Sequence, residues 1–97
     1  FKSERNMKIH CLAVILIIIL GFVYQISMIE WYICFILFGV VISAELFNTA
    51  IETVVNMVMP YKNEKAGLAK DIAAGAVLVL AIVAAIIGGF IFIPKIF

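Results

Sequence analysis

The chain has 97 residues, of which 67% are hydrophobic and 13% are charged, and its mean hydropathy is +1.28. A soluble domain of this length could not bury so much apolar surface, so integral membrane proteins are the class that fits. The formal net charge of +1 gives no reason to expect a nucleic-acid partner. At about 20 apolar residues per crossing, residues 1–97 are expected to form a single domain with about three spans.

The first apolar run follows a charged segment, residues 1–10. Cys11–Tyr24 is continuously apolar, and with its flanking residues it predicts a first span over about residues 9–26. We interpret this run as a retained helix and not as a signal peptide, because no small-residue cleavage site follows it and further spans do. Since the chain starts at Phe1 within a polar stretch, we expect a processed or truncated form.

Ser27 and Glu30 mark the start of a second helix. A serine followed three positions later by a glutamate is the pattern of a capping box, in which each side chain accepts a hydrogen bond from the other residue's backbone N–H. The helix is predicted over residues 28–59, because Pro60 ends it. Its length would be about 48 Å, against a hydrocarbon core of about 30 Å, so its C-terminal half is predicted to extend beyond one membrane face.

The third span is predicted over residues 71–93. The polar linker 61–69 precedes it, and Asp71 is a natural N-cap for a helix that begins at Ile72. Alanine and glycine are frequent in this segment, which suits the close approach of helices in a membrane. Pro94 is predicted to end the span.

The basic residues give the orientation. Three precede the first span (Lys2, Arg5 and Lys8), three lie between the second and third spans (Lys62, Lys65 and Lys70), and only Lys95 lies near the C-terminus. Because basic residues concentrate on the cytoplasmic side, the N-terminus and the long linker are predicted to be cytoplasmic and the C-terminus to be outside.

Polar side chains return on one face of the second helix. Glu45, Asn48, Glu52 and Asn56, here called the polar strip, are spaced by three, four and four residues and fall within about 80° of the helix circumference. An isolated carboxylate in hydrocarbon costs about 2.5 kcal/mol or more, so such a strip is expected to serve a function. Since three helices alone cannot enclose it, we predict a homo-oligomer in which Glu45 and Glu52 face a neighbouring protomer or a groove between protomers.

The charged residues near the cytoplasmic interface suit phosphoryl transfer. Glu45 and Glu52, with Glu4 on a neighbouring segment, form an oxygen-rich set of the kind that holds Mg²⁺. Lys70, predicted to lie beside a helix N-terminus, can bind phosphate there. A metal, a cation and a carboxylate free to act as a base are the parts that this reaction needs. The sequence contains no Walker A or protein-kinase signature, which excludes the nucleotide folds of soluble kinases.

The spacing of these residues also resembles a known family. Glu45-x-x-Asn48-Thr49-Ala50-Ile51-Glu52, followed by Ala69-Lys70-Asp71-x-Ala73-Ala74-Gly75-Ala76-Val77, is similar to the signature of the small prokaryotic integral-membrane lipid kinases, the diacylglycerol kinases and their undecaprenol kinase relatives. Residues 4–10, Glu-Arg-Asn-Met-Lys-Ile-His, resemble the stretch before the first span in the Gram-positive branch, which is associated with undecaprenol. The resemblance covers nearly the whole chain.

The resemblance implies an all-α membrane protein, a helical-bundle homotrimer with three transmembrane helices per protomer. Such a protein would lie in the bacterial plasma membrane with a cytoplasmic active site, and it would transfer the γ-phosphate of Mg-ATP to a lipid hydroxyl. By position, the resemblance assigns the general base to Glu45, a site-ordering amide to Asn48, the metal-binding carboxylates to Glu4 and Glu52, and nucleotide contacts to Lys70, Asp71 and Asn56.

Two departures from the family pattern stand out. Asn56 lies where the family usually has Asp, so one charge on the nucleotide side is absent. The N-terminal amphipathic surface helix of the family is largely missing from these residues, and since that helix helps to close the site, activity could be impaired.

Undecaprenol is the favoured acceptor, because of the Glu-Arg-Asn…His pattern near the N-terminus, and diacylglycerol is the close variant. An alternative function is a small oligomeric transporter in which Glu45 exchanges protons for substrate inside the membrane. A third is a structural subunit of a larger complex. The continuation of the polar strip to the cytoplasmic end, together with Lys70 and Asp71, favours the kinase over the transporter.

Overall fold

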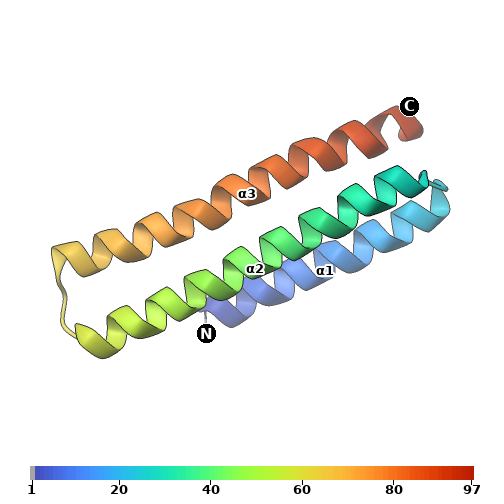
Figure 1. Cartoon of the computed structure of the whole chain (residues 1–97). Coiled ribbons are helices and arrows are strands. Elements are labelled where there is room, and N and C mark those ends of the chain that lie inside the picture. Colours follow the sequence, from blue (N-terminus) through green and yellow to red (C-terminus); the bar gives the residue numbers. More distant parts are fainter. Residues whose placement is uncertain (1) are drawn as a thin grey trace.

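Three antiparallel helices make up the computed structural model of the chain (Figure 1). They are α1 (Lys2–Val23), α2 (Met28–Val58) and α3 (Glu64–Ile96). The structure describes the backbone from residue 2 to residue 97 and the side chains from residue 7 onward. α2 packs against both other helices, and the N-terminus of α1 lies beside α2 well before the C-terminal end of α2 (Figure 1). The predicted all-α class is confirmed.

A tight turn joins α1 to α2, and Gln25 at its centre has a left-handed backbone with φ 50°. The N–H of Ile26 donates to the carbonyl of Gly21 at 3.1 Å, and the N–H of Gln25 donates to the carbonyl of Phe22 at 3.4 Å. These two bonds form a Schellman motif, in which glycine is the usual residue at the left-handed position. Ile26, the residue after Gln25, is buried.

The start and the end of α2 match the prediction. The Ser27 hydroxyl accepts from the Glu30 N–H at 3.2 Å, and a Glu30 carboxylate oxygen accepts from the Ser27 N–H at 2.9 Å, which is the predicted capping box. At the other end Val58 is the last helical residue and Met59 is the C-cap, directly before Pro60.

The predicted start of α3 is wrong. The helix begins at Glu64, and its N-cap is Asn63, whose side-chain oxygen accepts from the Ala66 N–H at 3.1 Å. Residues 64–70, Glu-Lys-Ala-Gly-Leu-Ala-Lys, are mostly strong helix formers, so nothing in them stops a helix that Asn63 has started. Asp71 therefore lies inside α3 and is not its N-cap.

The predicted end of α3 is also wrong, because the helix continues through Pro94 to Ile96. A proline removes one backbone hydrogen bond and bends the axis, but so close to the helix end there is little left to disrupt. Lys95, the residue after Pro94, forms an ion pair with α2. Its Nζ lies 2.9 Å from Glu30 Oε2 and 3.2 Å from the carbonyl oxygen of Ile91. This ion pair joins the end of α3 to the start of α2.

The apolar core lies near the α1–α2 turn. It is built on four buried residues (Ile26, Cys34, Ile91 and Phe92), and Trp31 packs against it. The Trp31 ring also lies over Gly21, where a side chain would collide with it.

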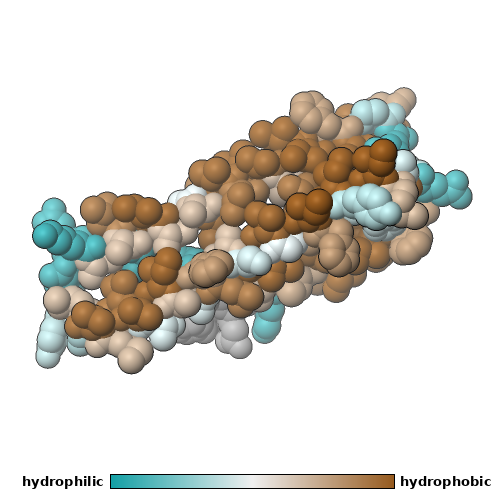
Figure 2. Space-filling view, in the orientation of Figure 1, coloured by the Kyte–Doolittle hydropathy of each residue, from teal (hydrophilic) through white to brown (hydrophobic). Residues whose placement is uncertain are grey.

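The exterior is apolar around the middle of the molecule and hydrophilic at the two ends of its long axis (Figure 2). The Cα atoms extend over 50 × 20 × 19 Å. α2 and α3 are long and apolar enough to cross a membrane, while the apolar part of α1, Met7–Val23, is shorter.

Candidate functional site

The polar strip lies on the inner face of α2 for part of its length. Glu45 is 1% exposed and Asn48 is 7% exposed, whereas Glu52 is half-buried and Asn56 is exposed. Asn48 Nδ2 donates to Glu52 Oε1 at 3.0 Å, which confirms that these two residues share a face. Among the residues with described side chains, Glu45 and Asn48 are the polar ones buried this deeply.

Glu45 meets α1 at His10. His10 Nε2 lies 3.5 Å from Glu45 Oε2, and the imidazole is partly exposed while the carboxylate is not. A carboxylate buried against hydrocarbon requires a partner, and an imidazole N–H is one of the groups that can supply it. The contact is a little longer than a hydrogen bond, so it fixes which oxygen of Glu45 faces α1 without fully satisfying it.

Two buried oxygen atoms have no hydrogen-bond partner within the part of the chain that the structure describes: Glu45 Oε1 and Asn48 Oδ1. Each unsatisfied buried acceptor costs about 1–3 kcal/mol, and more when it is charged. The two residues are three positions apart and share one face of α2, so both buried oxygens belong to that face. A ligand hydroxyl or a hard cation is the kind of group that such oxygens accept.

Lys70 and Asp71 lie within α3, Lys70 half-buried and Asp71 exposed. Lys95 of α3 pairs with Glu30 of α2, which gives a starting point for comparing levels along the two antiparallel helices. Lys70 lies 25 residues before Lys95, and Val55 lies 25 residues after Glu30. Counting along the antiparallel pair thus brings Lys70 level with residue 55, between Glu52 and Asn56. The expected position beside a helix N-terminus is wrong. No ion pair between Lys70 and the polar strip occurs among the described side chains.

The predicted metal ligands are only partly described. The side chain of Glu4 lies outside the described residues, although its backbone belongs to α1. From Met7 onward, no three His, Cys, Asp or Glu side chains come together in a way that could hold a metal ion.

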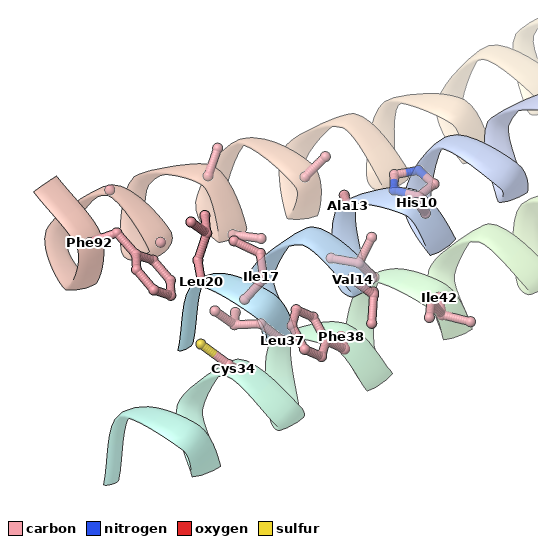
Figure 3. Close-up of a pocket in the computed structure, with 16 residues that line it drawn as sticks. His10, Ala13, Val14, Ile17, Leu20, Cys34, Leu37, Phe38, Ile42 and Phe92 are labelled. Carbon is pink, nitrogen blue, oxygen red and sulfur yellow. The ribbon is translucent and has the colours of Figure 1, made fainter. Parts of the chain in front are cut away.

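An apolar cavity of about 380 Å³ opens between the three helices (Figure 3). The wall from α3 consists of small residues apart from Phe92, namely Ala81, Ala84, Ala85, Gly88 and Gly89. His10 lies at one end of the cavity and Phe92 at the other (Figure 3). His10 therefore contacts both the cavity and Glu45.

Comparisons with known proteins decide the family. The family described as prokaryotic diacylglycerol kinase matches residues 1–92. The chain is 46% identical over 94 residues to the undecaprenol kinase of Bacillus subtilis, an alignment that covers 97% of this chain and 76% of that protein. The chain belongs to the prokaryotic diacylglycerol kinase family.

A second relative is the diacylglycerol kinase of a Synechocystis species, which is 36% identical over 95 residues. That alignment covers 97% of this chain and 54% of the Synechocystis protein, so the chain spans about half the length of that relative. No solved structure matches the chain at a significant level.

A member of the prokaryotic diacylglycerol kinase family is a lipid kinase with ATP as its co-substrate, which confirms the predicted enzyme class. The transporter and the structural subunit are set aside. Two helices able to span a membrane, together with the family, make the chain a membrane protein.

His10 is the residue of this kinase that sequence reasoning missed. In the sequence it contributed only to the pattern that favours undecaprenol as the acceptor. One signal was available: His10 is the only histidine, and it stands where the charged segment gives way to the apolar run of α1. A buried carboxylate elsewhere in the membrane needs a partner, and no lysine or arginine lies within the apolar runs.

Proposed function

We propose that this lipid kinase transfers the γ-phosphate of ATP to the hydroxyl of a membrane lipid alcohol at the polar strip of α2. Undecaprenol, giving undecaprenyl phosphate, is the favoured acceptor, and diacylglycerol, giving phosphatidic acid, is the close variant. The observation that carries the proposal is Glu45. Its carboxylate is 1% exposed, has one oxygen facing His10, and has a second oxygen with no partner among the described residues.

Glu45 is proposed as the general base. Its free Oε1 accepts the proton of the lipid hydroxyl, and the hydroxyl oxygen then bonds to the γ-phosphorus. The bond from the γ-phosphorus to the bridging oxygen breaks, and ADP leaves with that oxygen. Burial of Glu45 favours this reaction because water, a competing acceptor of the phosphoryl group, is excluded around the base.

Asn48 is proposed to order the site. Its amide donates to Glu52 at 3.0 Å, which fixes the direction of that carboxylate. The Asn48 Oδ1 atom is buried and has no described partner, so it stays open to a donor from the substrates.

Mg²⁺ fits the oxygen donors of this site. Glu52, and Glu4 by resemblance, would hold it. Glu4 stands six residues before His10, and Ile51 stands six residues after Glu45, so the antiparallel register supports placing Glu4 near the level of Glu52. When bound, the ion supplies positive charge that neutralises the phosphates during transfer.

Lys70, Asp71 and Asn56 are proposed to contact the nucleotide. The register of α2 and α3 supports this placement, since Lys70 lies level with the end of the polar strip. A lysine ammonium binds phosphate as a point charge. Asp71 and Asn56 are exposed, which suits contact with a ligand that arrives from water.

The kinase is proposed to work as a homotrimer in the bacterial plasma membrane, with all three helices crossing. The hydrophobic surface around the middle of the protomer, on the face that Figure 2 shows, is of the kind that lipid or a partner protomer covers. The positions of the basic residues support a cytoplasmic N-terminus and active site with the C-terminus outside. The single domain is proposed to comprise residues 1–97.

The identity of the acceptor is supported by similarity. The chain is 46% identical to the undecaprenol kinase of Bacillus subtilis and 36% identical to the diacylglycerol kinase of Synechocystis. Either lipid presents a hydroxyl at the membrane surface, so the reaction at Glu45 is the same for both.

The test measures transfer of labelled γ-phosphate from Mg-ATP to undecaprenol and to diacylglycerol, each in the same detergent micelles. Wild type is compared with Glu45→Gln, which removes the base and keeps the size of the side chain. Glu64→Gln is the matched control, because Glu64 is exposed at the start of α3 and forms no ion pair among the described side chains.

We expect phosphate on undecaprenol at a higher rate than on diacylglycerol, a loss of both in Glu45→Gln, and wild-type rates in Glu64→Gln. A higher rate on diacylglycerol would overturn the favoured acceptor alone. Equal activity in Glu45→Gln and wild type would overturn the assignment of the base.

A further inference from the structure

We propose that His10 is a positioning residue for phosphoryl transfer, which holds the Glu45 carboxylate so that one of its oxygens stays free for the lipid hydroxyl. This inference rests on the proposed role of Glu45 as the base. It adds a second residue of α1, beside the proposed metal ligand Glu4, to a site built mainly on α2 and α3.

The geometry around Glu45 is asymmetric. His10 Nε2 faces Oε2 at 3.5 Å, while Oε1 has no partner within the described part of the chain. A base needs one oxygen open to the incoming proton, and an unrestrained carboxylate could rotate either oxygen away from it. A donor on the other oxygen removes that freedom, in the way that a hydrogen-bonded carboxylate orients the histidine of a catalytic triad.

The contact is long for a hydrogen bond, as hydrogen bonds of catalytic groups often are before substrate binds. A movement of a few tenths of an ångström would bring it within hydrogen-bonding distance. His10 lies at the opposite end of the apolar cavity from Phe92 (Figure 3), and its imidazole is partly exposed, so it has room to move.

The location of His10 also links the base to the lipid. Of the residues described as lining the cavity, His10 alone carries ring nitrogens that can donate a hydrogen bond. His10 thus lies between the apolar cavity and the buried Glu45 carboxylate. A lipid alcohol bound at this point would have its apolar chain on the cavity side and its hydroxyl on the Glu45 side. A histidine that only packs at the end of the cavity would be replaceable by an apolar side chain, whereas one that positions Glu45 would not.

The test compares His10→Leu, His10→Gln and wild type in the micelle assay with Mg-ATP. Leucine suits the apolar cavity and has no donor, while the glutamine amide can donate toward Glu45. A misplaced catalytic group costs on the order of 10- to 100-fold in rate. We expect such a loss of kcat in His10→Leu with KM for ATP unchanged, and recovery of at least half of the wild-type kcat in His10→Gln.

Cys11→Ala is the matched control, because Cys11 is the exposed neighbour of His10 on α1. A role in packing alone predicts the reverse order, with leucine equal to or better than glutamine in both activity and melting temperature. That order, or a His10→Leu rate within twofold of wild type, would overturn the proposal. If His10→Leu does not fold, His10→Phe carries the same comparison with a ring of similar size.

Glu45→Gln is measured alongside to separate this inference from the proposed function. An inactive Glu45→Gln beside a fully active His10→Leu would refute the role of His10 and leave the base in place. An active Glu45→Gln would refute both.

Discussion

The two ends of the helical hairpins differ in how their polar groups are paired. At the end with the α1–α2 turn, Glu30 caps α2 through Ser27 and also pairs with Lys95 of α3. In the polar strip, Glu45 and Asn48 are more deeply buried, yet each has an oxygen without a described partner. The first end is arranged to hold the helices together, and the second leaves hydrogen-bonding capacity for ligands.

This difference predicts that substitutions at the two ends have opposite signatures. Changes in the polar strip should reduce catalysis and leave stability equal or greater. Changes near the turn should alter stability and leave the activity of the folded protein intact.

Apart from loss of the base itself, the largest effect is expected for Asn48→Leu. The change removes the amide that orients Glu52 and the unpaired acceptor Oδ1. We expect kcat to fall about 100-fold, the usual loss for one ordered polar contact in an active site, with no decrease in melting temperature. The kinase assay and thermal unfolding in the same detergent measure the two quantities. A parallel loss of stability would remove the contrast between the two ends.

The next largest effect is expected for Gly21→Val near the turn. A Cβ atom at Gly21 would lie 2.7 Å from Trp31 Cζ2, so the Trp31 ring or the two helices must shift. Such overpacking costs about 1–3 kcal/mol of unfolding free energy. Thermal unfolding measures it, and Gly67→Ala is the control, because nothing lies within 4 Å of a Cβ there. Equal stability of Gly21→Val and wild type would contradict the described packing.

Gln25→Gly is expected to have a smaller effect and to raise the free energy of unfolding instead of lowering it. Gln25 adopts φ 50°, a conformation that costs a residue with a Cβ about 1 kcal/mol and costs glycine nothing. The variant should therefore unfold at a higher temperature, with kcat unchanged. A lower melting temperature would show that the Gln25 side chain makes a contact of greater value than the strain.

The smallest effect is expected for Lys95→Met, which removes the ion pair with Glu30. Both side chains are partly exposed, and pairs of this kind contribute less than about 1 kcal/mol. A double-mutant cycle with Glu30→Gln isolates the pair from the capping box, which Glu30 also forms. A coupling well above this value would mean that the ion pair is a main determinant of the fold.

Local patterns in the sequence predicted local features. The capping box at Ser27 and Glu30 and the end of α2 before Pro60 depend on neighbouring residues, and both are confirmed. The shared face of Asn48 and Glu52 follows from helical periodicity alone. Asn63 also caps a helix, but the charged residues that follow it suggested a linker, and their helix propensity prevails over their polarity.

Contacts between helices were beyond prediction from this sequence. The His10–Glu45 and Glu30–Lys95 pairs join residues far apart in the chain, and each depends on the register of two antiparallel helices. Periodicity fixes the face of a helix but not its axial position against a neighbour. For the same reason the sequence grouped Lys70 with the polar strip without fixing the distance between them.

The most direct measurement is the kinase activity and the melting temperature of Glu45→Gln on one preparation. If the polar strip serves catalysis, removal of the base should lower kcat by about 100- to 10,000-fold while the melting temperature stays the same or rises. A variant that retains its activity, or one that loses activity because it unfolds, would contradict the assignment of Glu45 as the base of this lipid kinase.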